Sequence, residues 1–322
     1  MGMWPNKNKK ENNHHLSFFL SSDTYRSNIR KNKIIDQTVK FILLGAALLT
    51  VAAILIIVYT LASEALGFFS EVPLQEFLFG TRWTAFFADK SFGVLPLLAG
   101  TMLTTFIALG LAIPIGIGSA IFLSEYASTS LRTIIKPILE ILAGVPTVVY
   151  GYIALYFITP NLQIFIPDIN TYNATSAGIA MGIMVIPMIA SLSEDAFYSV
   201  PQNLKAAGYA LGARKSSVIL RIVIPYTLSA VFAVIILAMG RAIGETMIVA
   251  IAAGLRPTLT LDPFESIMTM TAAIAQAATG DAPVGTLPYT SLFAIAIYLF
   301  AIVAILNLIS SYIKSRWEIK HE

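Results

Sequence analysis

The sequence contains no cysteine and little charge, and its few histidines lie near the ends of the chain. The lack of cysteine among the 322 residues excludes disulfides, thiol nucleophiles and cysteine-ligated metals. The three histidines, His14, His15 and His321, leave the central region without a histidine base or metal ligand. Charged residues make up 12% of the chain, whereas a soluble domain carries about 25%. With 57% hydrophobic residues, the composition predicts an integral membrane protein, and we expect no metal or other cofactor.

Sequence signatures of several enzyme classes are also missing. No glycine is followed by lysine, so the Gly-x-x-x-x-Gly-Lys-Ser/Thr loop that holds nucleotide phosphates is absent. The chain has no Gly-x-Ser-x-Gly elbow, and its apolar segments carry no histidine and no paired aspartates. These absences argue against an ATPase and against an intramembrane enzyme.

Long apolar segments dominate what is present. Crossing about 30 Å of hydrocarbon takes about 20 helical residues, and six segments meet this length: 41–63, 92–124, 141–167, 169–193, 222–255 and 282–313. A long polar and basic tail precedes the first segment, which we therefore expect to be a retained anchor and not a cleaved signal. The sequence predicts an all-α, polytopic membrane protein with six transmembrane helices.

The distribution of lysine and arginine predicts the orientation of these spans. Most of these residues lie in the two tails and in two of the links between spans, whereas the opposite loops hold only Arg82, Lys90 and Arg256. Basic loops stay on the cytoplasmic side, so we expect a multi-pass protein of the inner (cytoplasmic) membrane with both termini cytoplasmic. Contact with anionic membrane lipid accounts for much of the tail charge, and nucleic-acid binding finds no support.

This topology defines the expected organisation of the chain. It comprises a cytoplasmic tail over 1–38, a membrane domain over 39–313 with a cytoplasmic loop over 194–222 and an external loop over 255–289, and a second tail over 314–322. In the external loop, Asp262, Pro263 and Glu265 predict a helix start with a capping box. The apolar stretch that follows, 267–278, is too short to span, which favours an interfacial or re-entrant helix. It either caps the bundle or forms a gate or docking surface.

Two pairs of glycines have a spacing typical of close helix packing. Gly178 and Gly182 form one pair, and Gly240 and Gly244 form the other. Small residues four positions apart let two membrane helices approach closely. We therefore expect a packed multi-helix assembly.

Arg241 and Glu245 lie one helical turn apart inside the fifth apolar segment. A charge at the bilayer centre costs roughly 2.5–3.5 kcal/mol on insertion scales, so such residues usually mark a functional site. Arg241 lies about 24 Å from Pro225 and about 20 Å from Gly254 at 1.5 Å per residue, a depth at which transporters commonly hold their substrates. The alternative is an ion pair within the helix, although its order, base before acid, is the less favourable one.

The link before the fifth segment contains Gly212, followed after nine residues by Ile222 and then by Ile224 and Pro225. This spacing resembles the conserved cytoplasmic loop of ATP-binding-cassette importer permeases: Glu-Ala-Ala, three residues, Gly, nine residues, Ile, one residue, Leu-Pro. Ala206 stands where that loop usually has glutamate, so any ion pair of the glutamate is missing. Gly212 suits a turn between two short helices, because glycine adopts left-handed backbone angles without steric cost.

Four further segments extend the resemblance to one subfamily. Residues 92–101, 114–127, 142–151 and 240–247 are similar to PstC-type permeases, which are subunits of the high-affinity phosphate importer. The likeness covers roughly 81–311, most of the chain. It implies the type I architecture of ABC importer permeases.

The resemblance also implies partners. These are a homologous second permease (PstA-type), a cytoplasmic dimer of ATP-binding subunits (PstB-type) and an extracytoplasmic phosphate-binding protein (PstS-type). The cytoplasmic loop would dock on the ATP-binding subunit through Lys205, Ala206, Ala207, Gly208, Leu211, Gly212 and Ala213.

Together these observations predict a permease subunit that moves inorganic phosphate inward by alternating access, driven by ATP hydrolysis on a separate subunit. The planar guanidinium of Arg241 would offer a positive charge that matches a passing tetrahedral anion. Glu245 would hold Arg241 in place and prevent the anion from binding too tightly. The alternatives are a permease for another oxyanion, such as molybdate or sulfate, and a passive anion channel, which would need no ATPase loop.

Overall fold

The computed structural model describes residues 8–317, with side chains described over 35–280 and 282–313. It contains two compact units, Met1–Thr60 and Leu61–Glu322. Six helices are long and apolar enough to cross a membrane: Ile35–Glu71, Leu95–Tyr126, Thr147–Phe165, Ala174–Tyr198, Lys215–Ile243 and Leu287–Ile313. The predicted all-α fold with six spans is therefore confirmed.

The first span belongs to α1 (Asn8–Glu71), which begins within the predicted N-terminal tail. From Ile35 onward its mean hydropathy is high, and its apolar residues are distributed around the whole helix and not along one stripe. A helix that is apolar all round is suited to lipid or to a protein interior. The remaining helices belong to the second unit.

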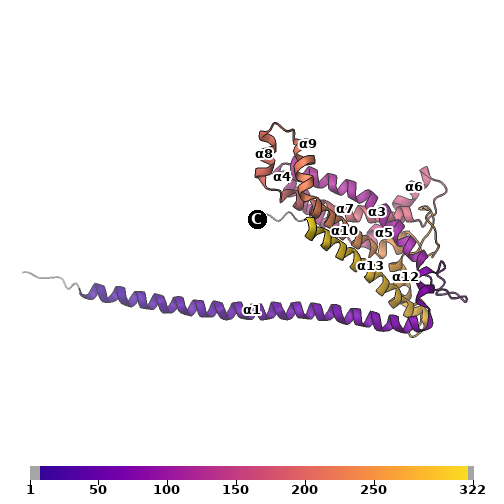
Figure 1. The fold of residues 1–322 in the computed structure, drawn as a ribbon, viewed down its shortest axis with the longest axis horizontal. Helices are drawn as coiled ribbons and strands as arrows, with labels where there is room; N and C mark the ends of the chain where they lie inside the picture. The colour runs from indigo at the N-terminus through magenta and orange to yellow at the C-terminus, as the bar shows by residue number, and fades with distance from the viewer. Residues whose placement is uncertain (1–7, 318–322) are drawn as a thin grey trace, which may run out of the picture. The chain divides into compact units, whose positions relative to one another are not determined.

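The core of the second unit is formed by α3 (Leu95–Ile121) and α7 (Ala174–Tyr198), which lie side by side (Figure 1). Two glycines of α7 allow this approach. A Cβ added at Gly178 would lie 2.7 Å from the side chain of Ile107, and one added at Gly182 would lie 2.9 Å from the carbonyl oxygen of Ala108. The predicted close packing at Gly178 and Gly182 is confirmed.

The other helices pack around this pair. The helices α10 (Ile224–Ile243) and α13 (Leu287–Trp317) contact each other, and α10 also contacts α3 and α7. The short helix α11 (Met247–Ala252) lies against α5 (Thr147–Ile153) and α7. The connecting elements are α2 (Leu74–Phe79), η1 (Phe122–Tyr126), η2 (Ala154–Ile158), η3 (Ile219–Val223) and η4 (Ala277–Asp281), the last four being π-helical turns.

The two ends of the bundle carry different elements (Figure 1). One end, here named the α8 end, holds α4 (Thr129–Ala143), α8 (Gln202–Ala210) and α9 (Lys215–Val218). The opposite end, named the α12 end, holds α6 (Thr159–Phe165) and α12 (Met270–Gln276).

The fifth apolar segment is broken, whereas the sequence predicted continuous apolar helix over 222–255. The helix α10 ends at Ile243, and α11 begins at Met247. The break arises because Glu245 caps the second helix: its Oε1 accepts hydrogen bonds from the backbone N–H groups of Met247 (3.0 Å) and Ile248 (3.2 Å). A capping carboxylate satisfies N–H groups that a new helix start leaves without partners.

The helix of the external loop begins later than predicted. The expected start at Pro263 is wrong, because backbone carbonyls of residues 263–265 accept hydrogen bonds from the segment that leads into α7, including the N–H of Thr175 to Pro263 (2.9 Å). The helix α12 starts at Met270, with Thr269 as its N-cap. Its first residues are buried against α3, α11 and α13. This burial favours the re-entrant alternative over the interfacial one.

Candidate functional site

Arg241 lies in the last turn of α10, beside the break, and its side chain is exposed in the isolated chain. Its Nη2 is 3.7 Å from Sδ of Met184, a buried residue of α7. Met184 follows the start of α7 at Ala174 by ten residues and precedes its end at Tyr198 by fourteen, about 15 and 21 Å at 1.5 Å per residue. The guanidinium therefore lies near the middle of a membrane-spanning helix.

Arg241 and Glu245 do not form an ion pair in the described part of the chain. The i,i+4 contact requires a continuous helix, and the break at 244–246 removes that geometry. The expectation that Glu245 holds Arg241 in place is therefore wrong for this chain alone, since Glu245 caps α11 instead. The break is also tied to α12, because the hydroxyl of Thr271 donates to the carbonyl oxygen of Glu245 (2.6 Å).

The second glycine pair is placed differently from the first. A Cβ added at Gly240 would have Val303 of α13 as its nearest neighbour, at an ordinary 4.0 Å. Gly244 is the C-cap of α10 and faces no other helix within 4 Å. Close packing at Gly240 and Gly244 is thus not found between the described helices of this chain, and a role of this pair in helix packing stays a prediction.

The predicted cytoplasmic loop forms a helix–turn–helix elbow, made of α8, Gly212 and α9. Gly212 has a φ of +77°, and its N–H donates to the carbonyl oxygen of Tyr209 (2.9 Å) while that of Ala213 donates to Gly208 (3.2 Å). An added Cβ at Gly212 would meet nothing within 4 Å, so glycine is required for its backbone angle and not for space. The predicted left-handed turn is confirmed.

The residues predicted to dock the ATP-binding subunit divide into two faces. Ala206, Ala207, Leu211 and Gly212 are exposed, and Ala213 is half-buried. The remaining two, Lys205 and Gly208, are buried against the rest of the chain.

The buried position of Gly208 explains one departure from the family pattern. A Cβ added at Gly208 would lie 2.7 Å from Cδ1 of Ile222 in η3 and 3.1 Å from Cγ2 of Val218 in α9. Glycine therefore stands where the family loop has its second alanine because α8 packs closely on η3 and α9 here.

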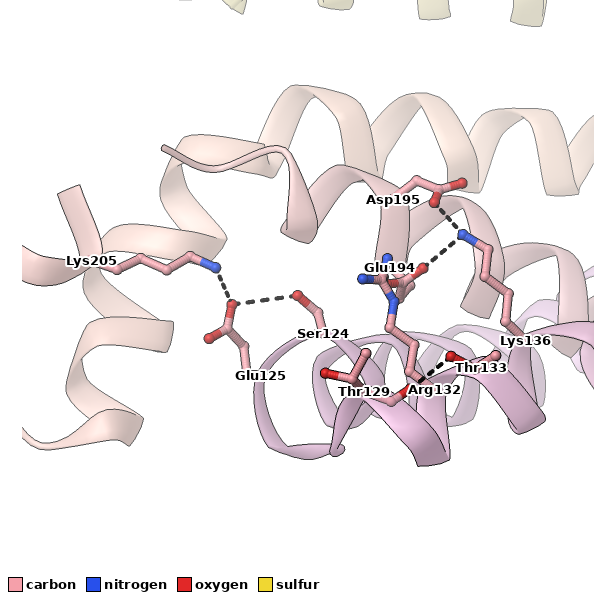
Figure 2. A network of polar contacts seen from close by, with 9 residues as sticks. All are labelled: Ser124, Glu125, Thr129, Arg132, Thr133, Lys136, Glu194, Asp195 and Lys205. Carbon is pink, nitrogen blue, oxygen red and sulfur yellow. Dashed lines mark hydrogen bonds and ion pairs between the residues drawn. The ribbon is translucent and has the colours of Figure 1, made fainter. Parts of the chain in front are cut away.

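Lys205 anchors the elbow to the end of α3. Its Nζ lies 2.5 Å from Oε1 of Glu125 in η1, and the two side chains are only 8% and 6% exposed (Figure 2). Ser124 donates a longer hydrogen bond of 3.4 Å to the same oxygen. Burial raises the pKa of nearby Tyr209, and the Glu125 carboxylate adds to this rise. Ala206 takes the place of the glutamate that this loop usually has. The elbow nevertheless forms an ion pair, in which the elbow contributes the cation, Lys205, and η1 contributes the anion, Glu125.

A second charge cluster at the α8 end holds α4 against α7 (Figure 2). Glu194, which is 1% exposed, forms ion pairs with Arg132 (2.5 Å) and Lys136 (3.0 Å). Lys136 also contacts Asp195 at 2.5 Å, and Arg132 lies 4.0 Å above the ring of Tyr198. The hydrogen bond to Asp195 is the main cause that raises the pKa of Lys136. Desolvation opposes this rise, and the contacts with Glu194 add to it.

Sequence reasoning missed these anchoring residues. Arg132 and Lys136 have the i,i+4 spacing of one helix face, and the adjacent acids Glu194 and Asp195 follow directly after an apolar run. Glu125 carries no comparable local signal, because its partner lies 80 residues away. In the described residues, no group of three or more His, Cys, Asp or Glu side chains is arranged to hold a metal ion.

Comparisons with known proteins agree with this geometry. The family described as "Binding-protein-dependent transport system inner membrane component" matches residues 112–319. The chain is 30% identical over 290 residues to a probable ABC transporter permease protein, YqgH, of Bacillus subtilis, covering 89% of this chain and 94% of that protein. It is 34% identical over 291 residues to the phosphate transport system permease protein PstC of Xylella fastidiosa, with coverages of 81% and 88%. For PstC of Mesorhizobium japonicum the identity is 35% over 260 residues, with coverages of 74% and 78%.

Solved structures show the same fold. A chain of the MetNI methionine ABC transporter, in an inward-facing conformation, matches with a TM-score of 0.51 and 16% identity, covering 70% of this chain and 94% of that chain. The family match covers more than half of the described chain, and the relatives match over most of their length. The chain therefore belongs to the family of binding-protein-dependent transport system inner membrane components.

Proposed function

We propose that the chain is the PstC-type permease subunit of an importer that moves inorganic phosphate into the cell. Relatives that carry the name of phosphate transport permeases support the substrate. The observation that carries the proposal is the placement of Arg241, a cation without a carboxylate partner among the described residues, beside a broken helix near the middle of the bundle.

The environment of Arg241 argues for a role in the anion pathway. Exposure of a charged side chain to lipid at this depth would cost roughly 2.5–3.5 kcal/mol on insertion scales, so it must face protein or a water-filled path. A second permease would supply the other wall of that path. The guanidinium donates several hydrogen bonds in one plane, which matches the oxygens of phosphate.

The structure changes the role that we propose for Glu245. Its carboxylate caps α11 and so sets the position of the break, while Arg241 stays available to an anion. Broken helices are a common way of building transporter substrate sites, because irregular backbone is tolerated where it lines a cavity. Glu245 is thus a positioning residue, and its negative charge near the pathway limits how tightly the anion is held.

The elbow is the proposed docking element for an ATP-binding subunit. Its exposed face includes Leu211, which is 89% exposed, together with Ala206 and Ala207. Apolar residues this exposed at the tip of a short helix are suited to a groove in a partner. The partners that we propose are a second permease of PstA type, an ATP-binding dimer of PstB type and an external phosphate-binding protein of PstS type.

The proposed orientation places the α8 end in the cytoplasm and the α12 end outside. Because the chain has no native cysteine, single cysteines report it without background. Cysteines at Thr81 and Thr279 should react with an impermeant thiol reagent added outside, and one at Ser216 should not; all three positions are exposed. Labelling of Ser216 from outside would overturn both the orientation and the docking role of the elbow.

Uptake of labelled phosphate tests the proposed substrate. Cells that lack this chain should lose high-affinity uptake and regain it when the chain is restored. Failure of restoration, with recovery of sulfate or molybdate uptake, would identify a permease for another oxyanion. Uptake that survives inactivation of the ATP-binding subunit would instead identify a passive channel.

A further inference from the structure

A cavity of about 410 Å³ lies at the α12 end. Three segments meet there: the loop after α2, which supplies Trp83 and Phe86, the segment after α11, which supplies Arg256, and the α12 region, which supplies Met268 and Gln276. The residues that line the cavity include a cation and an amide but no carboxylate. The lining is therefore electropositive.

Two polar side chains of this lining, those of Arg256 and Gln276, have no acceptor in the described part of the chain. The indole N–H of Trp83 also makes no hydrogen bond, but it is buried away from the water-accessible space of the cavity. Neither the guanidinium of Arg256 nor the side-chain amide of Gln276 has a hydrogen-bond or ion-pair partner within the described residues. A guanidinium and an amide without partners in the chain can both donate hydrogen bonds to a ligand in the cavity.

Backbone contacts fix two walls of the cavity. Trp83 pairs with Phe92 in an antiparallel bridge, and their rings meet edge to face with centroids 5.8 Å apart. Gly254, two residues before Arg256, has a φ of +89° and packs against Ser266 and Tyr172, so a side chain there would clash. Such a pre-formed wall loses little conformational freedom when a ligand binds.

We propose that this cavity receives a tetrahedral oxyanion, such as inorganic phosphate, before the anion reaches Arg241. Arg256 supplies the positive charge, and the side-chain amide of Gln276 donates a hydrogen bond to another oxygen of the anion. The absence of carboxylates from the lining avoids repulsion of the anion. The proposal deepens the proposed function and rests on its assignment of the α12 end to the outside.

Binding can be measured directly at Trp83. The full chain, assembled with its partner subunits, is labelled with 5-fluorotryptophan, and the ¹⁹F resonance of Trp83 is identified by its loss in Trp83→Phe. Inorganic phosphate is titrated without ATP, with chloride at matched ionic strength as the control anion. The resonance should shift saturably with phosphate and not with chloride.

Substitutions separate a built site from general charge. Arg256→Gln should weaken phosphate binding at least about tenfold, because it removes the only charged donor of the cavity. Lys90→Gln is the matched control, since it removes one positive charge from the same end without lining the cavity, and it should change the affinity less than about twofold, as expected for a screened surface charge.

The outcomes distinguish this proposal from the proposed function, because the titration requires no transport. If the cavity holds only water, phosphate should give no saturable shift, or the same shift as chloride and the same shift in Arg256→Gln as in the parent. Either result would overturn the proposal, even if phosphate uptake is normal. A saturable shift with sulfate but not with phosphate would overturn the assignment of phosphate to this cavity.

Discussion

The buried ion pair between Lys205 and Glu125 should hold the elbow to the end of α3. Lys205→Met removes one partner and leaves a carboxylate buried at 6% exposure. Breaking a buried pair in this way costs about 3–5 kcal/mol, which corresponds to a roughly 10²- to 10⁴-fold increase in the population of a detached elbow. The reversed pair, Glu125→Lys with Lys205→Glu, restores the attraction and should recover most of the loss.

A single cysteine at Val218 reports this detachment. Val218 is fully buried and lies beneath Gly208 of α8, and the chain contains no other thiol. Its alkylation should be slow in the parent, faster by about two to four orders of magnitude with Lys205→Met, and slow again in the reversed pair. Lys215→Met is the matched control, since Lys215 is exposed and lies over the ring of Tyr126. An unchanged rate in Lys205→Met would refute the anchoring role.

Three further predictions concern the elbow, the second charge cluster and the helix break. Gly212→Val should destabilise the left-handed turn by about 1–2 kcal/mol or more. Phosphate-stimulated ATP hydrolysis should fall while membrane insertion persists. Normal hydrolysis would count against docking through the elbow. Since the folded pKa of Lys136 is raised, its stabilisation is complete below its ordinary value of 10.5 and lost as the pH rises through the higher folded value. The difference in thermal stability between the parent and Lys136→Met should therefore be constant from neutral pH to below 10.5 and shrink above it; a loss near neutral pH would contradict this. Glu245→Ala should remove a helix cap worth about 0.5–2 kcal/mol and speed hydrogen exchange at Met247 and Ile248, whereas Glu245→Gln should have a smaller effect; equal protection in all three proteins would exclude the cap.

The fold was largely predictable from the sequence because apolar length alone identifies membrane spans. All six spans overlap the segments that hydropathy predicted, although the fifth ends at Ile243, and Gly212 adopts the left-handed angle expected at the end of a short helix. The family resemblance, carried by the loop and by four other segments, is confirmed by the family match over 112–319.

The break in the fifth span and the late start of α12 were not predictable in the same way. Glu245 could continue the helix or cap a new one, and its local sequence does not decide between them. Asp262 and Pro263 form a good local start signal, but the carbonyls of residues 263–265 bond to the start of α7, which is distant in sequence. Tertiary hydrogen bonds therefore override the local signal.

The anchors of the elbow depend on contacts between distant segments. Lys205 appeared as a docking residue because it lies in the loop, yet the structure turns it inward to Glu125. A periodic pattern cannot predict which side of this short helix faces its own chain, since the buried positions of α8 are Lys205 and Gly208, whereas most of its exposed positions are apolar. The pathway role of Arg241 stays a prediction, although its depth beside Met184 agrees with the estimate from sequence.

The central claim is that Arg241 serves phosphate transport directly, and uptake of labelled phosphate by proteoliposomes containing the complete transporter tests it. Arg241→Gln should nearly abolish ATP-driven uptake in an assembled complex, and Arg241→Lys should rescue only part, because lysine keeps the charge without the planar fork. Because the structure has no Arg241–Glu245 ion pair to break, Arg241→Gln with Glu245→Gln should remain as defective as Arg241→Gln alone. Near-normal uptake by the double variant would show that the two residues form a structural pair, and would contradict the pathway assignment.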